Sequence, residues 1–182
     1  MEKIILKDGR TVTIDRLIAA DKEALRAFDA ELSAHSRNLF TPHLYDSETL
    51  DKVIARNAAD EDVVFAAKAD GKIIGYCFLW YAKRRVPLLG IGVADNFQGA
   101  GLGHRLMQLL IDTGRALGAE GIELTTALHN DNAFALYQKC GFIFLRNVDN
   151  LVGDGNIRTE RCMFLPFRPD AQPMSEPHEA PV

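Results

Sequence analysis

A glycine-rich run at residues 98–104 reads Gln-Gly-Ala-Gly-Leu-Gly-His and leads directly into leucines at helical spacing. Small residues at a strand-to-helix turn leave backbone N–H groups and the positive end of the helix dipole facing one point, which suits a phosphate. The spacing is not the dinucleotide fingerprint G-x-G-x-x-G, because its third glycine would fall at His104 or Leu106. The run predicts a phosphate site of another kind, although glycines alone are equally typical of a tightly packed turn.

A second segment with chemical potential follows at residues 130–142. It contains Tyr137, whose phenol is a proton donor with an ordinary pKa of about 10. Phe134 precedes Tyr137 by three residues, a spacing that is also typical of the buried face of a helix. The spacing alone therefore leaves two interpretations of Tyr137, an acid catalyst and a core aromatic.

Turns and periodicity predict the elements that position these residues. Short β-rich runs flank Asp8-Gly9 and again Asp70-Gly71, and each Asp-Gly pair predicts a hairpin. Helical spacing over 21–32, and again after Asp46 and Ser47, predicts two amphipathic helices joined by a loop. Strand, glycine loop and helix follow, and then further strands around one more helix. The order indicates a mixed α/β fold.

The two segments together resemble the GNAT superfamily of acyl-CoA dependent N-acetyltransferases. The pattern Gln98-x-x-Gly101-x-Gly103 is similar to the family's pyrophosphate loop, and 130–142 is similar to its other common stretch, in the same order and at the same distance. The resemblance implies a mostly antiparallel seven-stranded sheet with helices on both faces. It also implies acetyl transfer from acetyl-CoA to a primary amine, on a small molecule or a protein lysine, by direct attack in a ternary complex.

The resemblance also assigns roles to individual residues. It makes Tyr137 the general acid that protonates the CoA thiolate. The predicted cofactor-binding residues are Ile91, Gly92, Val93, Gln98, Gly99, Ala100, Gly101, Leu102, Gly103, His104, Asn130 and Tyr137. Gly90 and Gly92 suit close approach of a ligand to the strand, or equally a bulge against a neighbouring helix. Asn130 has a further interpretation as the residue that closes a turn.

The general base is the role that the sequence leaves open. An amine of pKa about 10.4 is neutral in only about 10⁻³ to 10⁻⁴ of molecules near pH 7, so a base or a desolvating pocket is needed. Many relatives carry a glutamate on the strand before the glycine loop, whereas residues 86–91 here hold no ionisable group. His129 is named as a base or relay, and Glu123 as an alternative acting through water. The missing carboxylate supports a second function, a non-catalytic acyl-CoA sensor.

Composition narrows the remaining choices. The net charge of −4, from 21 basic and 25 acidic residues, argues against a nucleic-acid partner. Cys77, Cys140 and Cys162 are far apart without a C-x-x-C pair, so we expect no disulfide framework and no metal site. No apolar stretch is long enough to span a membrane, and the N-terminus lacks a leader pattern, so we expect a cytoplasmic protein. Many relatives pair, which makes a homodimer possible.

Length and composition also divide the chain. Its 182 residues suit one domain, which we place at 1–167. Residues 168–182 hold prolines together with Gln, Ser and Glu, a composition that buries little apolar surface and predicts a disordered tail. Substrate choice is expected to lie in the loops, chiefly 33–47, 83–87 and 149–158.

Overall fold

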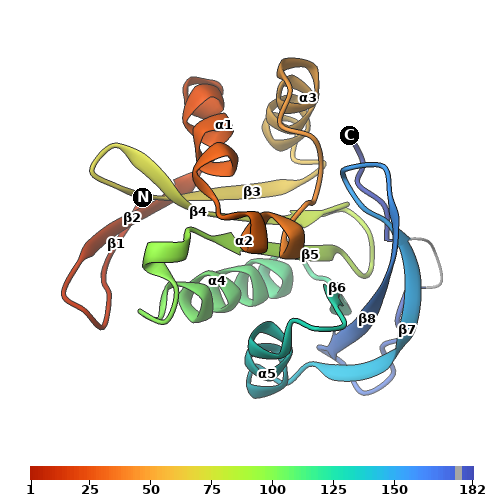
Figure 1. Ribbon diagram of the computed structural model, residues 1–182. Coiled ribbons are helices and arrows are strands. Elements are labelled where there is room, and N and C mark those ends of the chain that lie inside the picture. The colour runs from red at the N-terminus through yellow and green to blue at the C-terminus, as the bar shows by residue number, and fades with distance from the viewer. Residues whose placement is uncertain (175–177) are drawn as a thin grey trace.

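The computed structural model describes residues 1–174 and 178–182, and its centre is one eight-stranded sheet (Figure 1). The strand order is β1-β2-β3-β4-β5-β6-β8-β7, and every neighbouring pair is antiparallel except β5 and β6. The strands are β1 Glu2–Ile5, β2 Thr11–Arg16, β3 Val63–Ala69, β4 Lys72–Trp80, β5 Leu88–Val93, β6 Gly121–Ala127, β7 Ile143–Leu151 and β8 Ile157–Pro166.

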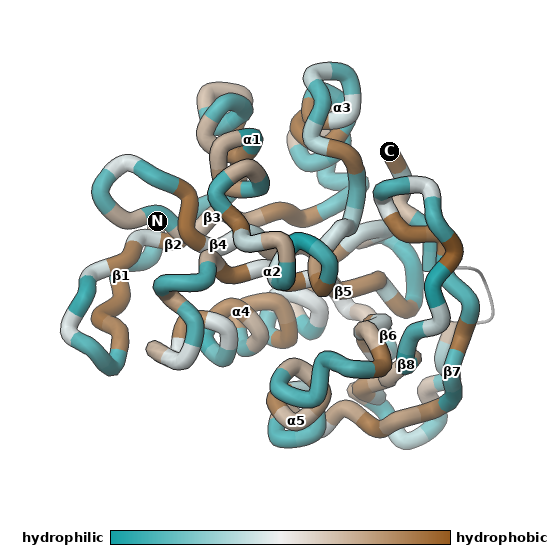
Figure 2. The backbone as a smooth tube through the Cα atoms, viewed as in Figure 1, coloured by the Kyte–Doolittle hydropathy of each residue, from teal (hydrophilic) through white to brown (hydrophobic). Residues whose placement is uncertain are grey.

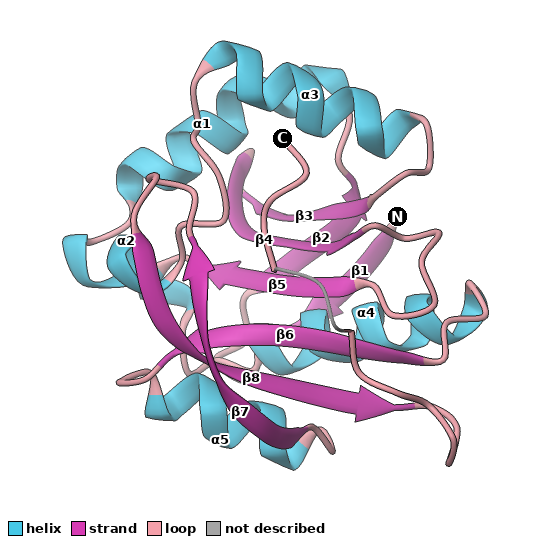
Figure 3. Ribbon diagram, turned by 90° about the vertical axis from the view of Figure 1, so that its right-hand side faces the viewer, coloured by secondary structure: helices cyan, strands magenta, loops and turns pink. Residues whose placement is uncertain are grey.

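Helices cover both faces of this sheet. Figures 1 and 3 show α1 and α3 over one face and α4 across the other, with α5 beside β6 and β8. The five helices of the described chain are α1 Lys22–Glu31, α2 Ala34–Leu39, α3 Ser47–Ala58, α4 Leu102–Ala116 and α5 Asp131–Lys139, with short 3₁₀ turns at Ala19–Asp21 and Asp95–Phe97. The predicted mixed, mostly antiparallel fold is confirmed.

Each face of the sheet has its own apolar core. One core gathers around α4, where Leu102, Leu106 and Leu110 are fully buried. The other lies under α1 and α3 and includes Leu25 and Leu50. Figure 2 shows the corresponding hydrophobic segments at the centre of the molecule, along β3, β4 and β5, with hydrophilic segments on the hairpin tips. Burial of these side chains is the main stabilising contribution to the fold.

The structure departs from the predicted elements in three places. The sheet has eight strands and not seven, because both arms of the N-terminal hairpin pair into it. The loop expected after α1 contains α2, whose six residues are too few to show an amphipathic period. Strand β8 begins at Ile157, five residues before the expected start at Cys162. The sequence pattern missed this part of the strand because Arg158, Thr159 and Glu160 show no apolar alternation.

Strands β5 and β6 part from one another soon after they meet. Their register contains one pair, Leu88 with Glu123, and the Glu123 N–H donates to the Pro87 carbonyl over 3.1 Å. On its other side β5 pairs with β4 along its whole length, from Leu88 to Val93. The backbone of residues 90–93 therefore has one paired edge and one edge that faces a gap.

The C-terminal segment crosses the face covered by α1 and α3 (Figure 3). Its described residues, 168–174 and 178–182, carry no helix or strand. They nevertheless contact the sheet: the Met174 N–H donates to Glu123, and the Tyr81 hydroxyl donates to the Glu179 carbonyl over 3.1 Å. The division into a domain at 1–167 and a disordered tail stays a prediction.

Candidate functional site

The glycine-rich loop forms the N-terminal cap of α4. Gly99 and Gly101 have φ angles of +74° and +94°, in the left-handed region that glycine adopts without steric cost. Gly101 is the N-cap of α4, so the amides of the first turn have no partner inside the helix. That turn carries no acidic side chain, which leaves the positive end of the helix dipole open to an anion.

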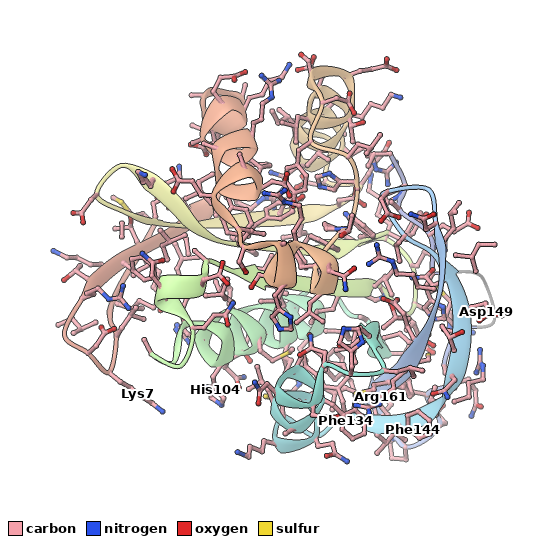
Figure 4. All side chains as sticks on the ribbon, viewed as in Figure 1. Lys7, His104, Phe134, Phe144, Asp149 and Arg161 are labelled. Carbon is pink, nitrogen blue, oxygen red and sulfur yellow. The ribbon has the colours of Figure 1, made fainter. Side chains whose placement is uncertain are left out.

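The tip of the first hairpin adds a cation beside this loop. The Lys7 N–H donates to the Ala100 carbonyl over 3.1 Å, and the Lys7 side chain passes within 3.4 Å of the position that a Cβ on Gly101 would occupy. Figure 4 shows Lys7 and His104 near the same end of α4. No local sequence pattern indicates Lys7, because its contact joins two segments that lie far apart along the chain.

The Gln98 side chain ties the loop to its surroundings. Its amide Nε2 donates to the Val93 carbonyl over 3.1 Å and to the Ser36 hydroxyl over 3.2 Å. The Asp95 carboxylate accepts from the Ser33 N–H and from both hydroxyls of Ser33 and Ser36, and these hydrogen bonds lower its pKa to about 2. Gln98 and Asp95 together fix α2 against the end of β5.

A cavity of about 770 Å³ runs from the glycine loop along the free edge of β5 to α5. The predicted residues that line it are Ile91, Gly92, Val93, Gln98, Gly99, Gly103, His129, Asn130 and Tyr137. Ala100 and Leu102 do not line it, because their side chains are buried in the core around α4, and His104 is exposed outside it. Nine of the site residues predicted from the sequence therefore line one cavity.

Packing explains why glycine is needed at positions 90 and 92, which the sequence alone did not settle. A Cβ on Gly90 would lie 2.2 Å from the Phe78 ring, and one on Gly92 would lie 2.4 Å from the Phe40 ring. Two aromatic rings therefore press against β5 on the face opposite α4. Neither expected explanation is needed for these two glycines, because a side chain of the protein itself occupies the space.

Tyr137 lies on α5 as a buried residue, 8% exposed, with its ring centroid 6.0 Å from that of Phe142. Burial first, and the negative charge of Glu160 second, raise the pKa of the phenol, so it stays protonated at neutral pH. Within the described chain no group hydrogen-bonds its hydroxyl, and the residue lines the large cavity. Tyr137 is therefore both a core aromatic and a proton donor available to a ligand.

Helix α5 is anchored by a cap at its N-terminus and by contacts with Arg161. The Asn130 side chain caps its N-terminus by accepting from the Ala133 N–H over 3.2 Å, which matches the turn-closing interpretation of Asn130. The Arg161 guanidinium lies 4.5 Å from the Phe134 ring centroid, and it also contacts Asp131 at 3.0 Å (Figure 4). These contacts hold Tyr137 in place at the wall of the cavity.

The two candidate bases differ in their surroundings. His129 is exposed and lines the large cavity beyond the end of β6. Glu123 is fully buried, and its carboxylate accepts from Cys162, His178 and the Met174 N–H. Burial alone would raise the pKa of Glu123, and these three hydrogen bonds outweigh it and hold the pKa below its usual range. Glu123 is held by these three donors and lines neither the large cavity nor the smaller one described below.

A smaller cavity of about 80 Å³ adjoins the large one, and both are lined by Leu89, Gly90 and Thr125. Asn150 and Glu160 also line it. The Asn150 Nδ2 donates to Glu160 over 3.0 Å, and among the described residues the buried Asn150 Oδ1 has no hydrogen-bond partner. A buried acceptor without a donor is unusual, and a bound donor or water is the ordinary reason.

Sequence reasoning missed Glu160, and it included Asn150 only as part of the segment 149–158 that was expected to set substrate choice. Both lie on the last hairpin, in the half of β8 that the pattern did not predict and on the strand that pairs with it. Because acidic and amide side chains are common on exposed strands, nothing in the local sequence marks these two as special.

Comparison with known proteins gives the family. The model of the acetyltransferase (GNAT) family matches residues 27–142, more than half of the chain and both motifs. The chain belongs to this family. Acetyl-CoA is the family's co-substrate, so the expected enzyme class and co-substrate are confirmed. In the described part of the chain, no helix is both long and apolar enough to cross a membrane.

Individual relatives agree with this assignment. The chain is 29% identical over 148 residues to N-alpha-acetyltransferase RimI of Mycobacterium tuberculosis, covering 74% of this chain and 80% of that protein. Ribosomal-protein-alanine N-acetyltransferase from Brucella melitensis shares the fold with a TM-score of 0.70 at 21% identity, over 85% of this chain and 99% of the other. Spermidine N-acetyltransferase from Vibrio cholerae, solved with CoA and spermine, has a TM-score of 0.69 at 20% identity, over 85% and 95%.

Proposed function

We propose that this GNAT acetyltransferase transfers an acetyl group from acetyl-CoA to a primary amine by direct attack, with Tyr137 protonating the departing thiolate. The observation that carries the proposal is the single cavity that joins the glycine loop to Tyr137 along the free edge of β5. A site of this shape suits a long ligand with an anionic group at one end and a reactive group at the other.

The residues around the cavity fit acetyl-CoA. Amides of residues 99–104 at the start of α4, together with Lys7, would hold the diphosphate. The unpaired backbone edge of residues 91–93 offers hydrogen-bond donors and acceptors to the pantetheine amides. Acetyl-CoA supplies the activated acetyl thioester, and the chain supplies orientation and proton transfer.

Tyr137 suits the role of general acid because of its surroundings. Its phenol is protonated at neutral pH, makes no hydrogen bond with any described residue, and lines the cavity. A thiolate of ordinary pKa about 8.5 gains from a hydrogen-bond donor at the moment the carbon–sulfur bond breaks. Cys140 has no such role, because burial raises the pKa of its thiol and direct transfer needs no enzyme nucleophile.

The smaller cavity suits the amine. Glu160 and the orphan Asn150 Oδ1 are both acceptors, and an ammonium group brings three donors and no acceptor. Glu160 fixes the amide so that its oxygen, and not its nitrogen, stays free. We therefore propose that Glu160 and Asn150 seat the amine and that Glu160 receives its proton, in the place of the base that the sequence did not identify. His129 keeps the role of an alternative relay.

The class of amine acceptor can be identified by testing candidate amines one at a time. The names of the relatives suggest two acceptor classes, α-amino groups of proteins and polyamines. The sequence suggested small amines and protein lysines. Incubating the full chain with acetyl-CoA and, in turn, an alanine-ended peptide, a lysine peptide and spermidine measures thiol release for each. Release with an amine, above the rate without it, supports the proposal. Binding of acetyl-CoA without thiol release in the presence of any of these amines would favour the non-catalytic sensor instead.

Other expectations remain proposals of the same kind. We propose a cytoplasmic protein whose partners are acetyl-CoA and an amine, without nucleic acid, and with a homodimer as a possible assembly. Sedimentation of the purified chain at several concentrations would distinguish the monomer from the dimer.

A further inference from the structure

A buried cluster of three different donor atoms lies beside the proposed amine cavity, and its histidine, His178, lines that cavity. The Glu123 Oε1 lies 2.9 Å from the Cys162 Sγ and 3.0 Å from the His178 Nε2, and the sulfur lies 3.6 Å from that nitrogen. Glu123 and Cys162 are fully buried, and His178 is only 6% exposed. Oxygen, sulfur and nitrogen thus meet within one small volume.

Three separate segments supply these atoms. Glu123 comes from β6 and Cys162 from β8, and these two strands pair with Thr125 directly opposite Cys162, so the carboxylate and the thiol share one face of the sheet. His178 comes from the C-terminal segment that crosses this face. The second carboxylate oxygen, Oε2, accepts from the Met174 N–H over 2.7 Å, which fixes the carboxylate with Oε1 turned toward the sulfur and the nitrogen.

We propose that Glu123, Cys162 and His178 bind a divalent zinc ion. Carboxylate oxygen, thiolate sulfur and imidazole nitrogen are the three ligand types that zinc takes in proteins. Zinc–ligand bonds of about 2.0 to 2.3 Å at tetrahedral angles separate the ligand atoms by about 3.3 to 3.6 Å. The observed separations of 2.9, 3.0 and 3.6 Å therefore need shifts of only a few tenths of an ångström.

Charge supports a metal in this place. The carboxylate and a Cys162 thiolate together carry two negative charges, which a zinc ion neutralises among buried side chains. As the zinc–sulfur bond forms, the thiol proton leaves to solvent, because metal ligands must be deprotonated. The Met174 N–H on Oε2 is the kind of outer contact that orients a metal-binding carboxylate.

The site also has an access route and a structural purpose. His178 and Ala180 line the smaller cavity, so an ion or a fourth ligand such as water can reach the cluster from there. The segment that carries His178 has no helix or strand of its own, and Met174, Ala180 and Val182 pack on the core around Trp80. A metal ion would fasten this segment to the sheet as one wall of the amine cavity.

The expectation of no metal site came from sequence spacing. Zinc motifs are recognised by pairs of ligands a few residues apart, whereas these three ligands are spread over more than fifty residues. Only the pairing of β6 with β8 and the return of the C-terminal segment bring them together.

The test uses the full chain, stripped of metal with a chelator and dialysed. Titration calorimetry with zinc chloride should give one site, and zinc at about a hundredfold excess over Kd should raise Tm by about 5 to 10 °C. Cobalt(II) added as a probe should produce a thiolate-to-cobalt charge-transfer absorption. None of these readouts depends on acetyl transfer, so failure of the zinc site is distinguishable from failure of the proposed function.

Two variants and a control complete the experiment. His178→Gln leaves the sheet intact and should weaken zinc binding at least tenfold, and Cys162→Ser should abolish the cobalt charge-transfer band. Cys140→Ser, a thiol away from the cluster, should bind zinc as the wild type does. Absence of zinc binding in the wild type, unchanged binding in His178→Gln, or a persisting charge-transfer band in Cys162→Ser would each overturn the proposal.

Discussion

Asn150 donates an amide N–H to the Glu160 carboxylate over 3.0 Å, and its own buried oxygen meets no donor in the part of the chain that the structure describes. The pair lies in the wall of the smaller cavity, next to the point where β5 and β6 part. Both groups accept hydrogen bonds, which is the reason that we place the amine there.

Glu160→Gln should raise KM for the amine about tenfold or more and leave the Kd for acetyl-CoA within twofold. A hydrogen bond to a charged group contributes about 1.5 to 3 kcal/mol, and the amide removes that charge. Steady-state kinetics with each substrate varied in turn measures both values. Asp149→Asn is the matched control, an exposed acidic residue on the same hairpin that lines neither cavity. An unchanged amine KM in Glu160→Gln would remove Glu160 from the site.

Gly99→Ala should weaken acetyl-CoA binding severalfold. A side chain at a φ of +74° costs about 1 to 2 kcal/mol, and the loop relieves this strain by moving the amides that face the diphosphate. Gly118→Ala is the control, because Gly118 has a φ of +77° and equally open surroundings at the far end of α4. The two variants should lose similar stability in urea, and calorimetry should show weaker cofactor binding only in Gly99→Ala. Equal binding in both would separate the loop from the cofactor.

Stability should fall in mild acid because of His43. Its Nε2 lies 2.9 Å from the Tyr76 hydroxyl and its Nδ1 lies 2.7 Å from the Leu44 carbonyl, which suits the neutral ring. Burial lowers the pKa of His43 to about 4 from an ordinary 6.5, so the unfolded chain binds a proton that the folded chain refuses. The contribution is present above pH 6.5 and is lost as the pH falls toward 4, by about 3 kcal/mol in total.

Urea unfolding between pH 7 and pH 4.5 measures this loss. His43→Asn removes the titrating group and should show a shallower fall in the free energy of unfolding over the same interval. If the variant and the wild type lose stability in parallel, His43 does not titrate as its burial requires.

The sequence predicted most of the elements because their signals are local. Asp8-Gly9 and Asp70-Gly71 mark both early hairpins, and the Asp46 cap marks the start of α3, where its carboxylate accepts from the Thr49 N–H. Family resemblance then identified the glycine loop and Tyr137 as site residues. In the structure, most of the residues predicted in this way line the large cavity.

Contacts between distant segments were not predictable in this way. Glu160 became a candidate only through its hydrogen bond with Asn150 across the last hairpin. Glu123 is hydrogen-bonded to His178 of the C-terminal segment. Gly90 is required by the Phe78 ring on the neighbouring strand, a fact that no local pattern contains. The sequence left the base open because Glu160, the residue that we propose for this role, lies on β8 at the smaller cavity and not on the strand before the glycine loop.

The central claim is that Tyr137 protonates the thiolate of a cofactor held by the glycine loop, and Tyr137→Phe tests it most directly. The substitution keeps the ring that packs on Phe142 and removes only the hydroxyl. With the best amine at saturation, kcat should fall about 10²- to 10³-fold while the Kd for acetyl-CoA, measured by calorimetry, stays within twofold. A kcat equal to that of the wild type would contradict the account.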